Sequence, residues 1–271
     1  MIEKKIKRVL KRGLREKVWE KESYYRLAQE GSFNISHPGM RILKNLSKKT
    51  EKILDLGCGE GTRLNYLVGK NKKGVGIDIS RTAINLAKKK YSNLKFVQAD
   101  LEKIPLKNNS FDLVYSAFVL EHIPDPDKAL NEGIRVIQKR GYFVLIAPNY
   151  GSPNRSSPPF RESRLEKLIR GFSDDLLRLS RKTDHLVWNK VTPMADAEKY
   201  EMDWDTTIEP YMGTLIEFLK NKNMKIIKAT SCWSEELSGT KPHQVLFRIL
   251  GKLRIYPFWM WGPHFVVVAQ K

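Results

Sequence analysis

The sequence predicts an α/β protein built on a doubly wound, mostly parallel β-sheet. Short apolar runs alternate with amphipathic helical stretches between residues 51 and 150, as consecutive βαβ units require. The first apolar run ends in a glycine-rich turn at residues 57–61, and a helical stretch follows it. Polar residues end or follow the later runs, at the carboxyl edge where such sheets bind ligands; these are Asp78, Asp100, Ser116 and Asn149.

The predicted strands are short runs rich in apolar and β-branched residues. They cover residues 53–56, 74–79, 94–100, 110–116, 142–147, 224–230 and 265–269. Apolar residues that recur at helical spacing predict the helices. These cover residues 2–21, 40–46, 63–68, 81–91, 127–138, 165–179, 206–219 and 245–253. Thr206 and Glu209 have the spacing of a capping box at the start of the 206–219 helix.

Three regions are expected from this pattern. Residues 1–50 form an N-terminal basic helical segment, in which residues 2–21 carry an apolar stripe and a strongly basic opposite face. Residues 51–150 and 206–271 form the ligand-binding core. Residues 151–205 are too long for a connection and are expected to be an inserted lid on the acceptor side. A dimerisation arm is the alternative for this insertion.

The glycine-rich turn is the most informative stretch of the chain. Gly57, Gly59 and Gly61 stand at alternate positions, and Thr62 occupies the place of the third glycine in the dinucleotide-binding pattern. Asp55 lies inside the strand, where a dinucleotide-binding strand is usually apolar. The turn therefore predicts a nucleotide-sized ligand other than NAD.

Two carboxylates at later strand ends complete the predicted nucleotide site. Asp78 follows the turn by about 20 residues, the spacing at which a carboxylate can accept hydrogen bonds from ribose hydroxyls. The alternative is that Asp78 caps the next helix, although Ser80 can do so itself. Asp100 could accept the exocyclic amine of adenine, with the Leu101 backbone at the ring edge; capping of a loop is its alternative.

Composition limits the remaining possibilities. The chain of 271 residues has two cysteines and five scattered histidines, so neither a disulfide framework nor a structural metal is expected. No apolar stretch reaches the length of a membrane span, and a reducing cytoplasm is expected. The formal net charge of +19 suits nucleic acid, an anionic membrane or an anionic acceptor, but also a solvated lysine-rich surface. The basic helix over 2–21 could lie on anionic lipid or simply cap the core.

The run Asp55-Leu56-Gly57-Cys58-Gly59-Glu60-Gly61 resembles the first motif of class I S-adenosylmethionine-dependent methyltransferases. Residues 111–114 and 120–123 are similar to the branch that includes the ubiquinone and menaquinone biosynthesis methyltransferases. The resemblance covers roughly residues 50–150. It implies a Rossmann-like methyltransferase fold, S-adenosylmethionine as donor and S-adenosylhomocysteine as product.

The resemblance also implies roles for individual residues. Asp55 anchors the methionine amino group, directly or through water, and Asp78 holds the ribose. The other implied donor contacts are Gly57, Cys58 and Gly59 against the methionine and ribose, Ile79 against the adenine, Asp100 and Leu101 at the adenine edge, and Ser116 and Phe118 beside the sulfonium. The donor needs no metal ion.

The acceptor has no comparable motif. No Asn/Asp-Pro-Pro-Tyr/Phe run follows the fourth strand, which disfavours methylases of DNA adenine and protein glutamine. We expect transfer to oxygen of a small-molecule, lipid-linked or glycan acceptor. An RNA methyltransferase and a non-catalytic donor-binding regulator are the alternatives. A cytoplasmic protein, with peripheral contact to the membrane as an option, is expected.

His122 is the candidate general base, because it follows the fourth strand near the methyl-donor end and can be neutral at pH 7. The alternative is a histidine that caps or packs the next helix. Aromatic and acidic residues of the insertion suit a hydroxyl-rich acceptor such as a sugar. They are Trp188, Tyr200, Trp204, Asp196, Glu201, Asp203 and Asp205.

Overall fold

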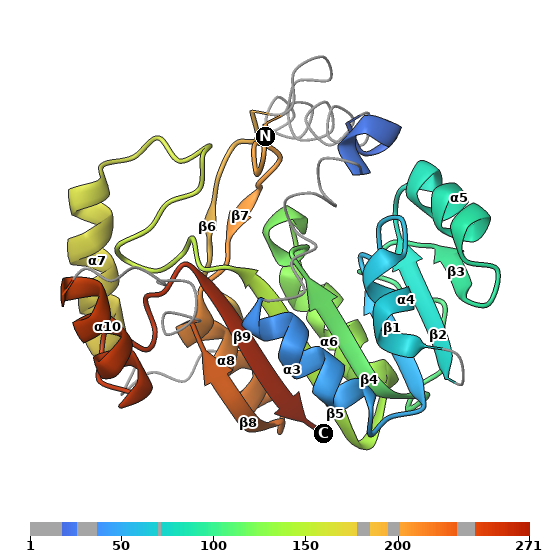
Figure 1. The fold of residues 1–271 in the computed structure, drawn as a ribbon. Helices are drawn as coiled ribbons and strands as arrows, with labels where there is room; N and C mark the ends of the chain where they lie inside the picture. Colours follow the sequence, from blue (N-terminus) through green and yellow to red (C-terminus); the bar gives the residue numbers. More distant parts are fainter. Residues whose placement is uncertain (1–17, 26–36, 70–71, 178–184, 195–200, 232–241) are drawn as a thin grey trace.

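A seven-stranded sheet organises the protein in the computed structural model (Figure 1). The structure describes residues 18–25, 37–69, 72–177, 185–194, 201–231 and 242–271. Most of the helix predicted over residues 2–21 lies outside this part of the chain. The strand order is β3-β2-β1-β4-β5-β9-β8.

Five parallel strands form most of the sheet, and one strand runs against its neighbours. The strands are β1 (Lys52–Leu56), β2 (Lys73–Asp78), β3 (Lys95–Gln98), β4 (Phe111–Ala117), β5 (Ile137–Pro148), β8 (Lys225–Thr230) and β9 (His264–Gln270). β9 is antiparallel to both β5 and β8. The predicted doubly wound, mostly parallel sheet is therefore confirmed. The strand order reverses between β1 and β4, which creates a crevice at the carboxyl ends of these strands.

Helices cover both faces of the sheet (Figure 1). On one face lie α3 (Pro38–Ser47), α4 (Thr62–Val68) and α5 (Arg81–Lys90). On the other lie α6 (Pro126–Val136) and α8 (Met212–Asn221), together with the short 3-10 helix η1 (Leu120–His122). Two further helices, α7 (Arg164–Leu177) and α10 (Pro242–Lys252), lie at the end of the molecule away from α5.

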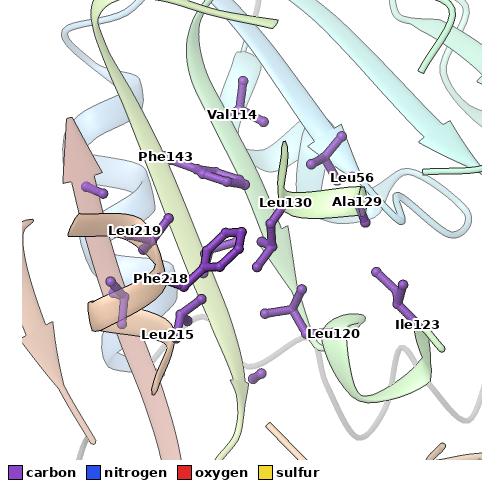
Figure 2. Close-up of a cluster of buried hydrophobic side chains, with 14 of the residues drawn as sticks. Leu56, Val114, Leu120, Ile123, Ala129, Leu130, Phe143, Leu215, Phe218 and Leu219 are labelled. Carbon is purple, nitrogen blue, oxygen red and sulfur yellow. The ribbon is translucent and has the colours of Figure 1, made fainter. Parts of the chain in front are cut away.

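Apolar side chains fill the space between the sheet and each helical layer. Figure 2 shows Leu56 and Val114 of the sheet beside Leu130 of α6 and Phe218 of α8, around Phe143 of β5. All five are at most 3% exposed. Burial of each such side chain contributes about 1.5–3 kcal/mol, so these contacts hold the carboxyl ends of the strands in fixed positions.

Two predictions of local structure are wrong. The expected capping box of Thr206 and Glu209 does not start a helix, because β7 (Ile208–Glu209) pairs with β6 (Asn189–Lys190) in an antiparallel ribbon. The helix starts only at Met212. The predicted boundary between the 127–138 helix and the 142–147 strand is also wrong, because β5 already begins at Ile137 and shifts register against β4 near Phe111. Both errors concern pairing between distant segments, which local spacing does not reveal.

Candidate donor and acceptor site

The glycine turn lies at the crevice between β1 and β4 and is fastened to β2. The amides of Gly57 and Cys58 donate to the Ile77 carbonyl at 2.8 and 2.9 Å. Gly57 has φ +77°, and a Cβ there would lie 2.5 Å from Val119. A Cβ at Gly59, by contrast, would meet only Tyr25, at 3.7 Å. Glycine at 57 is therefore required by the chain itself, whereas Gly59 leaves room on the open side of the turn.

Asp78 ends β2 beside this turn. Its Oδ2 accepts a hydrogen bond from the Gly59 amide and its Oδ1 accepts one from the Ser80 amide, both at 2.9 Å. Ser80 caps α5 by accepting from the Ala83 amide, so Asp78 is not needed as the cap of that helix. Burial raises the pKa of Asp78, although the backbone hydrogen bonds oppose the shift. The half-buried carboxylate keeps lone pairs available for a ligand.

The loop after β3 contains the predicted adenine contacts. β3 ends at Gln98, and Asp100 accepts a hydrogen bond from the Glu102 amide at 2.9 Å. Asp100 thus caps its own loop, which was the alternative to the adenine role. Leu101 is 8% exposed with its side chain in the core, so only its backbone could reach a ligand. Ile79 is half-buried beside Asp78.

Two buried polar atoms near the ends of β1 and β4 have no hydrogen-bond partner within the described part of the chain. They are Oδ1 of Asp55 and Oγ of Ser116, and both residues are 1% exposed. The other oxygen of Asp55 accepts a hydrogen bond from the Tyr115 hydroxyl at 2.6 Å. Burial raises the pKa of Asp55 to about 7, against the opposing effects of Tyr115 and the Arg63 charge. Orphaned buried polar atoms are rare and fit a polar ligand that reaches this crevice.

Cys58 and Phe118 take different positions around the turn. The Cys58 side chain packs into the core, where a Cβ at Gly76 would lie 2.7 Å from its sulfur, so only its backbone faces the turn. Phe118 follows β4 with φ +59°, a conformation that costs an L residue about 1 kcal/mol or more. Its ring lies 5.5 Å from those of His37 and His264. These contacts hold the strained residue at the carboxyl edge.

A short N-terminal segment, residues 18–25, covers the turn, although no role at the donor site was predicted for it from the sequence. The Glu20 carboxylate accepts hydrogen bonds from the amides of Arg81 and Thr82 at 3.0 Å, at the start of α5. The Trp19 carbonyl accepts from the Ser80 hydroxyl at 2.8 Å and from the Tyr25 hydroxyl at 2.7 Å. In the sequence, the cluster of aromatic residues around Tyr25 was the available sign of such a contact, but it has no helical or strand periodicity.

His122 ends η1, just after β4, and lies among carboxylates. Its Nδ1 is 3.4 Å from Oδ2 of Asp205, and its Nε2 is 3.8 Å from Oε1 of Glu121. Asp205 also accepts hydrogen bonds from Trp19 Nε1 at 2.9 Å and from the Tyr24 hydroxyl at 3.2 Å. Residues 18–25 therefore connect the donor turn with the carboxylate beside His122.

The electrostatics of this cluster favour a charged imidazole. Burial lowers the pKa of His122, but the negative charges of Asp205, Glu121 and Asp203 outweigh it and raise the pKa above its usual value. Burial raises the pKa of the Glu121 carboxyl to about 7, although His122 opposes the shift. Glu121 is 1% exposed, and its Oε2 has no hydrogen-bond partner among the described residues. The cluster can thus hold or accept a proton near neutral pH.

The structure separates the predicted acceptor residues of the insertion. Asp203 and Asp205 lie near His122, and Asp203 accepts a hydrogen bond from the Tyr150 hydroxyl at 2.5 Å. Trp188 is instead a core residue, 6% exposed, whose indole donates to the Thr214 hydroxyl at 2.7 Å. The prediction that the Trp188 ring stacks on an acceptor is therefore wrong. Trp204 is half-buried and Glu201 is exposed; Asp196 and Tyr200 lie outside the described residues.

Comparison with known proteins identifies the family. A family model described as a methyltransferase domain matches residues 47–229, which is more than half of the chain. The chain belongs to the class I S-adenosylmethionine-dependent methyltransferases.

Individual relatives match this methyltransferase over about two fifths of its length. It is 32% identical over 113 residues to the ubiquinone/menaquinone biosynthesis C-methyltransferase UbiE of Campylobacter jejuni, covering 39% of this chain and 48% of that protein. It is 30% identical over 117 residues to a probable S-adenosylmethionine-dependent methyltransferase of Mycobacterium tuberculosis, covering 42% of this chain and 43% of that protein. The chain thus spans less than half the length of these curated relatives.

Solved methyltransferase structures share the fold. The S-adenosylmethionine-dependent methyltransferase of Mesorhizobium loti superposes with a TM-score of 0.55 at 15% identity, over 88% of this chain and 100% of that one. A TehB-like methyltransferase of Corynebacterium glutamicum superposes with a TM-score of 0.51 at 17% identity, over 92% of this chain and 95% of that one.

Proposed function

We propose that this methyltransferase transfers a methyl group from S-adenosylmethionine to a hydroxyl oxygen of a small-molecule, lipid-linked or glycan acceptor. The single observation that carries the donor assignment is the Asp78 carboxylate, which two backbone amides hold beside the glycine turn at the strand-order reversal. A doubly wound sheet binds a nucleotide at this strand-order reversal, and a carboxylate there can accept hydrogen bonds from the ribose hydroxyls.

The surrounding residues fit the rest of the donor. The buried, unpartnered Oδ1 of Asp55 suits an ammonium group such as the methionine amine. Gly57 gives the turn its conformation, and Gly59 lets the ligand approach the backbone. Backbone groups of Cys58 and Leu101, the side chains of Ile79 and Asp100, and Ser116 and Phe118 at the end of β4 complete the proposed donor site. When bound, the donor supplies an electrophilic methyl group on a positively charged sulfur.

On the acceptor side, His122 is the proposed general base. Its neutral imidazole would take the proton of the acceptor hydroxyl while an oxygen lone pair forms the bond to the methyl carbon. The methyl–sulfur bond would break at the same time, and S-adenosylhomocysteine would leave with that electron pair. Asp205 lies 3.4 Å from Nδ1 and stabilises the imidazolium that results. The neutral form of His122 increases with pH, so the transfer rate should rise as pH passes through the pKa of His122. The neighbouring carboxylates raise that pKa.

Calorimetry and product analysis test the proposal together. The protein should bind S-adenosylmethionine and S-adenosylhomocysteine but not NAD. A donor labelled with carbon-13 in the methyl group then reports the acceptor atom, because the shifts of O-methyl, N-methyl and C-methyl carbons differ. His122→Gln should lower the transfer rate about 10²- to 10⁴-fold with donor affinity unchanged. Full transfer by this variant would instead favour a packing role for His122.

Two other acceptors have specific support. The similarity to UbiE, a C-methyltransferase by name, favours transfer to carbon, and a C-methyl signal in the labelled product would establish it. The net charge of +19 favours RNA. Binding of RNA would weaken steeply as salt increases, whereas binding of an uncharged small acceptor would not. Donor binding without transfer to any acceptor fraction would favour the non-catalytic regulator.

A further inference from the structure

Two helices at one end of the molecule expose most of its large apolar side chains. Of thirteen exposed large apolar residues in the described part of the chain, ten lie in α7 or in the segment of α10 and the residues just after it. These ten define the α7–α10 face: Leu165, Leu168, Ile169, Phe172, Leu176, Leu177, Leu246, Ile249, Leu253 and Ile255. Figure 1 shows both helices at the end of the molecule away from α5.

The two helices present their apolar stripes outward. The single buried residue of α7 is Lys167, and α10 has none. On α7, Leu165, Ile169, Phe172 and Leu176 recur at helical spacing and are 44–65% exposed. An amphipathic helix normally buries this stripe, and a contiguous exposed apolar patch marks an interaction surface.

Buried polar contacts fix α7 in this orientation. Lys167 donates to Glu209 and to the Tyr150 carbonyl at 2.5 and 2.7 Å, on the side of the helix opposite the apolar stripe. Asp175 accepts hydrogen bonds from the Tyr256 hydroxyl and Trp261 Nε1, at 3.1 and 3.0 Å. The second pair ties α7 to the segment that follows α10, so both helices belong to one surface.

The basic residues in and after α10 favour an anionic partner for this face. Residues 242–264 contain no Asp or Glu, but they include Arg248, Lys252 and Arg254, of which Lys252 and Arg254 are exposed. Cationic side chains beside an exposed apolar stripe are typical of a helix that lies in a membrane interface. The net charge of +19 adds attraction to anionic headgroups.

We infer that the α7–α10 face docks the protein on an anionic phospholipid bilayer, with the apolar side chains inserted at the headgroup boundary. Among the described helices, none is long and apolar enough to cross a bilayer. A second copy of the chain is the alternative occupant, and the test below separates it from a bilayer. The inference concerns location and does not depend on which acceptor is methylated.

Vesicle flotation of the full chain tests the docking. The protein should bind vesicles of phosphatidylcholine mixed with phosphatidylglycerol and bind phosphatidylcholine alone at least about tenfold more weakly. Leu165→Ser with Leu253→Ser, which are 65% and 66% exposed, should weaken binding about tenfold. The matched control is Val187→Ser with Ile227→Ser, which changes exposed apolar residues outside the face and should leave binding unchanged.

A second pair of variants tests the charges. Arg248→Gln with Lys252→Gln should weaken binding to anionic vesicles about fivefold per charge, whereas Lys88→Gln with Lys89→Gln on α5 should have a smaller effect. Calorimetric donor binding, retained in every variant, reports folding and separates a docking failure from a failure of the proposed function.

Three outcomes would overturn the inference. Wild-type protein could fail to bind anionic vesicles. Binding could persist in both α7–α10 variants, which would assign it to the basic N-terminal region. Light scattering could show a homodimer that Leu165→Ser with Leu253→Ser dissociates without loss of vesicle binding, and a second copy would then be the partner of this face.

Discussion

At the scale of single residues, the site depends on carboxylates whose surroundings differ. Asp78 is held by two backbone amides, Asp55 by a tyrosine hydroxyl, and Asp205 by an indole and a tyrosine hydroxyl. Because of these different partners, each carboxylate can interact with a different kind of group. Asp78 can accept hydrogen bonds from a ligand, Asp55 can pair with a cation, and Asp205 can stabilise the His122 imidazolium.

Asp78→Ala tests the donor assignment. Loss of the ribose hydrogen bonds and of the contact to the Gly59 amide should weaken S-adenosylmethionine binding at least about tenfold, since hydrogen bonds to charged groups are worth about 1.5–3 kcal/mol each. Asp125→Ala, which removes a surface carboxylate paired with Lys128, should leave the affinity unchanged in calorimetry. Unchanged affinity in a folded Asp78→Ala variant would contradict the ribose role.

Asp205→Asn tests the electrostatic environment of His122. Removal of the nearest negative charge should lower the pKa of His122, because Asp205 is the strongest influence that raises it. The titration of the imidazole Cε1 signal by NMR measures the shift. Asp127→Asn is the control, since that carboxylate lies 3.0 Å from the exposed His185 and should not change the His122 titration. An equal response to both substitutions would exclude a specific effect of Asp205.

At the scale of secondary-structure elements, a buried ion pair joins α7 to β7. Lys167 and Glu209 are 3% and 0% exposed and lie 2.5 Å apart. Glu209 also accepts hydrogen bonds from the amide and hydroxyl of Ser157. The pair thus holds α7, the loop at Ser157 and β7 together and orients α7 with its apolar stripe outward.

Lys167→Met should lower the free energy of unfolding by about 3–5 kcal/mol, because it leaves the Glu209 carboxylate buried without its cation. Arg170→Met on α7 removes an exposed ion pair with Glu162, which precedes the helix, and should cost less than about 0.5 kcal/mol. Urea denaturation of both variants measures the difference. Equal losses would mean that the buried pair contributes no more than a surface pair.

At the scale of the whole molecule, several buried acids make stability depend on pH. Asp55 and Glu121 have pKa values of about 7 in the folded protein, above their ordinary values of 3.8 and 4.5. The folded state therefore binds more protons than the unfolded state between about pH 4 and pH 7. The stabilisation from these protons is complete below the unfolded pKa values and is lost as pH rises through the folded ones. The raised pKa of His122 acts in the same direction.

We expect the free energy of unfolding to fall as pH rises from about 5 to 8, and Glu121→Gln to reduce this fall. A shift from 4.5 to about 7 corresponds to a change on the order of 3 kcal/mol. Urea denaturation at several pH values measures the slope. Glu132→Gln is the control, because Arg135 lowers the pKa of Glu132 and its contribution changes only at lower pH. A fall of the same size in Glu121→Gln would refute the assignment.

The sequence by itself determined the glycine turn and the carboxylate beside it, which form the proposed donor site. The strand, the Gly57 turn and the Asp78 and Ser80 pair are local features, since a βαβ unit brings its own strand ends and helix start together within about 25 residues. Their residue types follow from backbone conformation and capping, which a single stretch of chain reveals. The same reasoning predicted the sheet class correctly.

Only the tertiary structure decided the surroundings of His122 and the orientation of α7. Asp205 lies beside His122 although it follows it by 83 positions in the chain. Glu209 pairs with Lys167 instead of capping a helix. Trp188 is buried, while the stripe of α7 is exposed, although both are apolar features of one insertion. Burial and long-range pairing depend on which segments meet in space. Local periodicity shows that a helix has an apolar face, but only the packed fold shows whether that face meets protein or remains open to a partner.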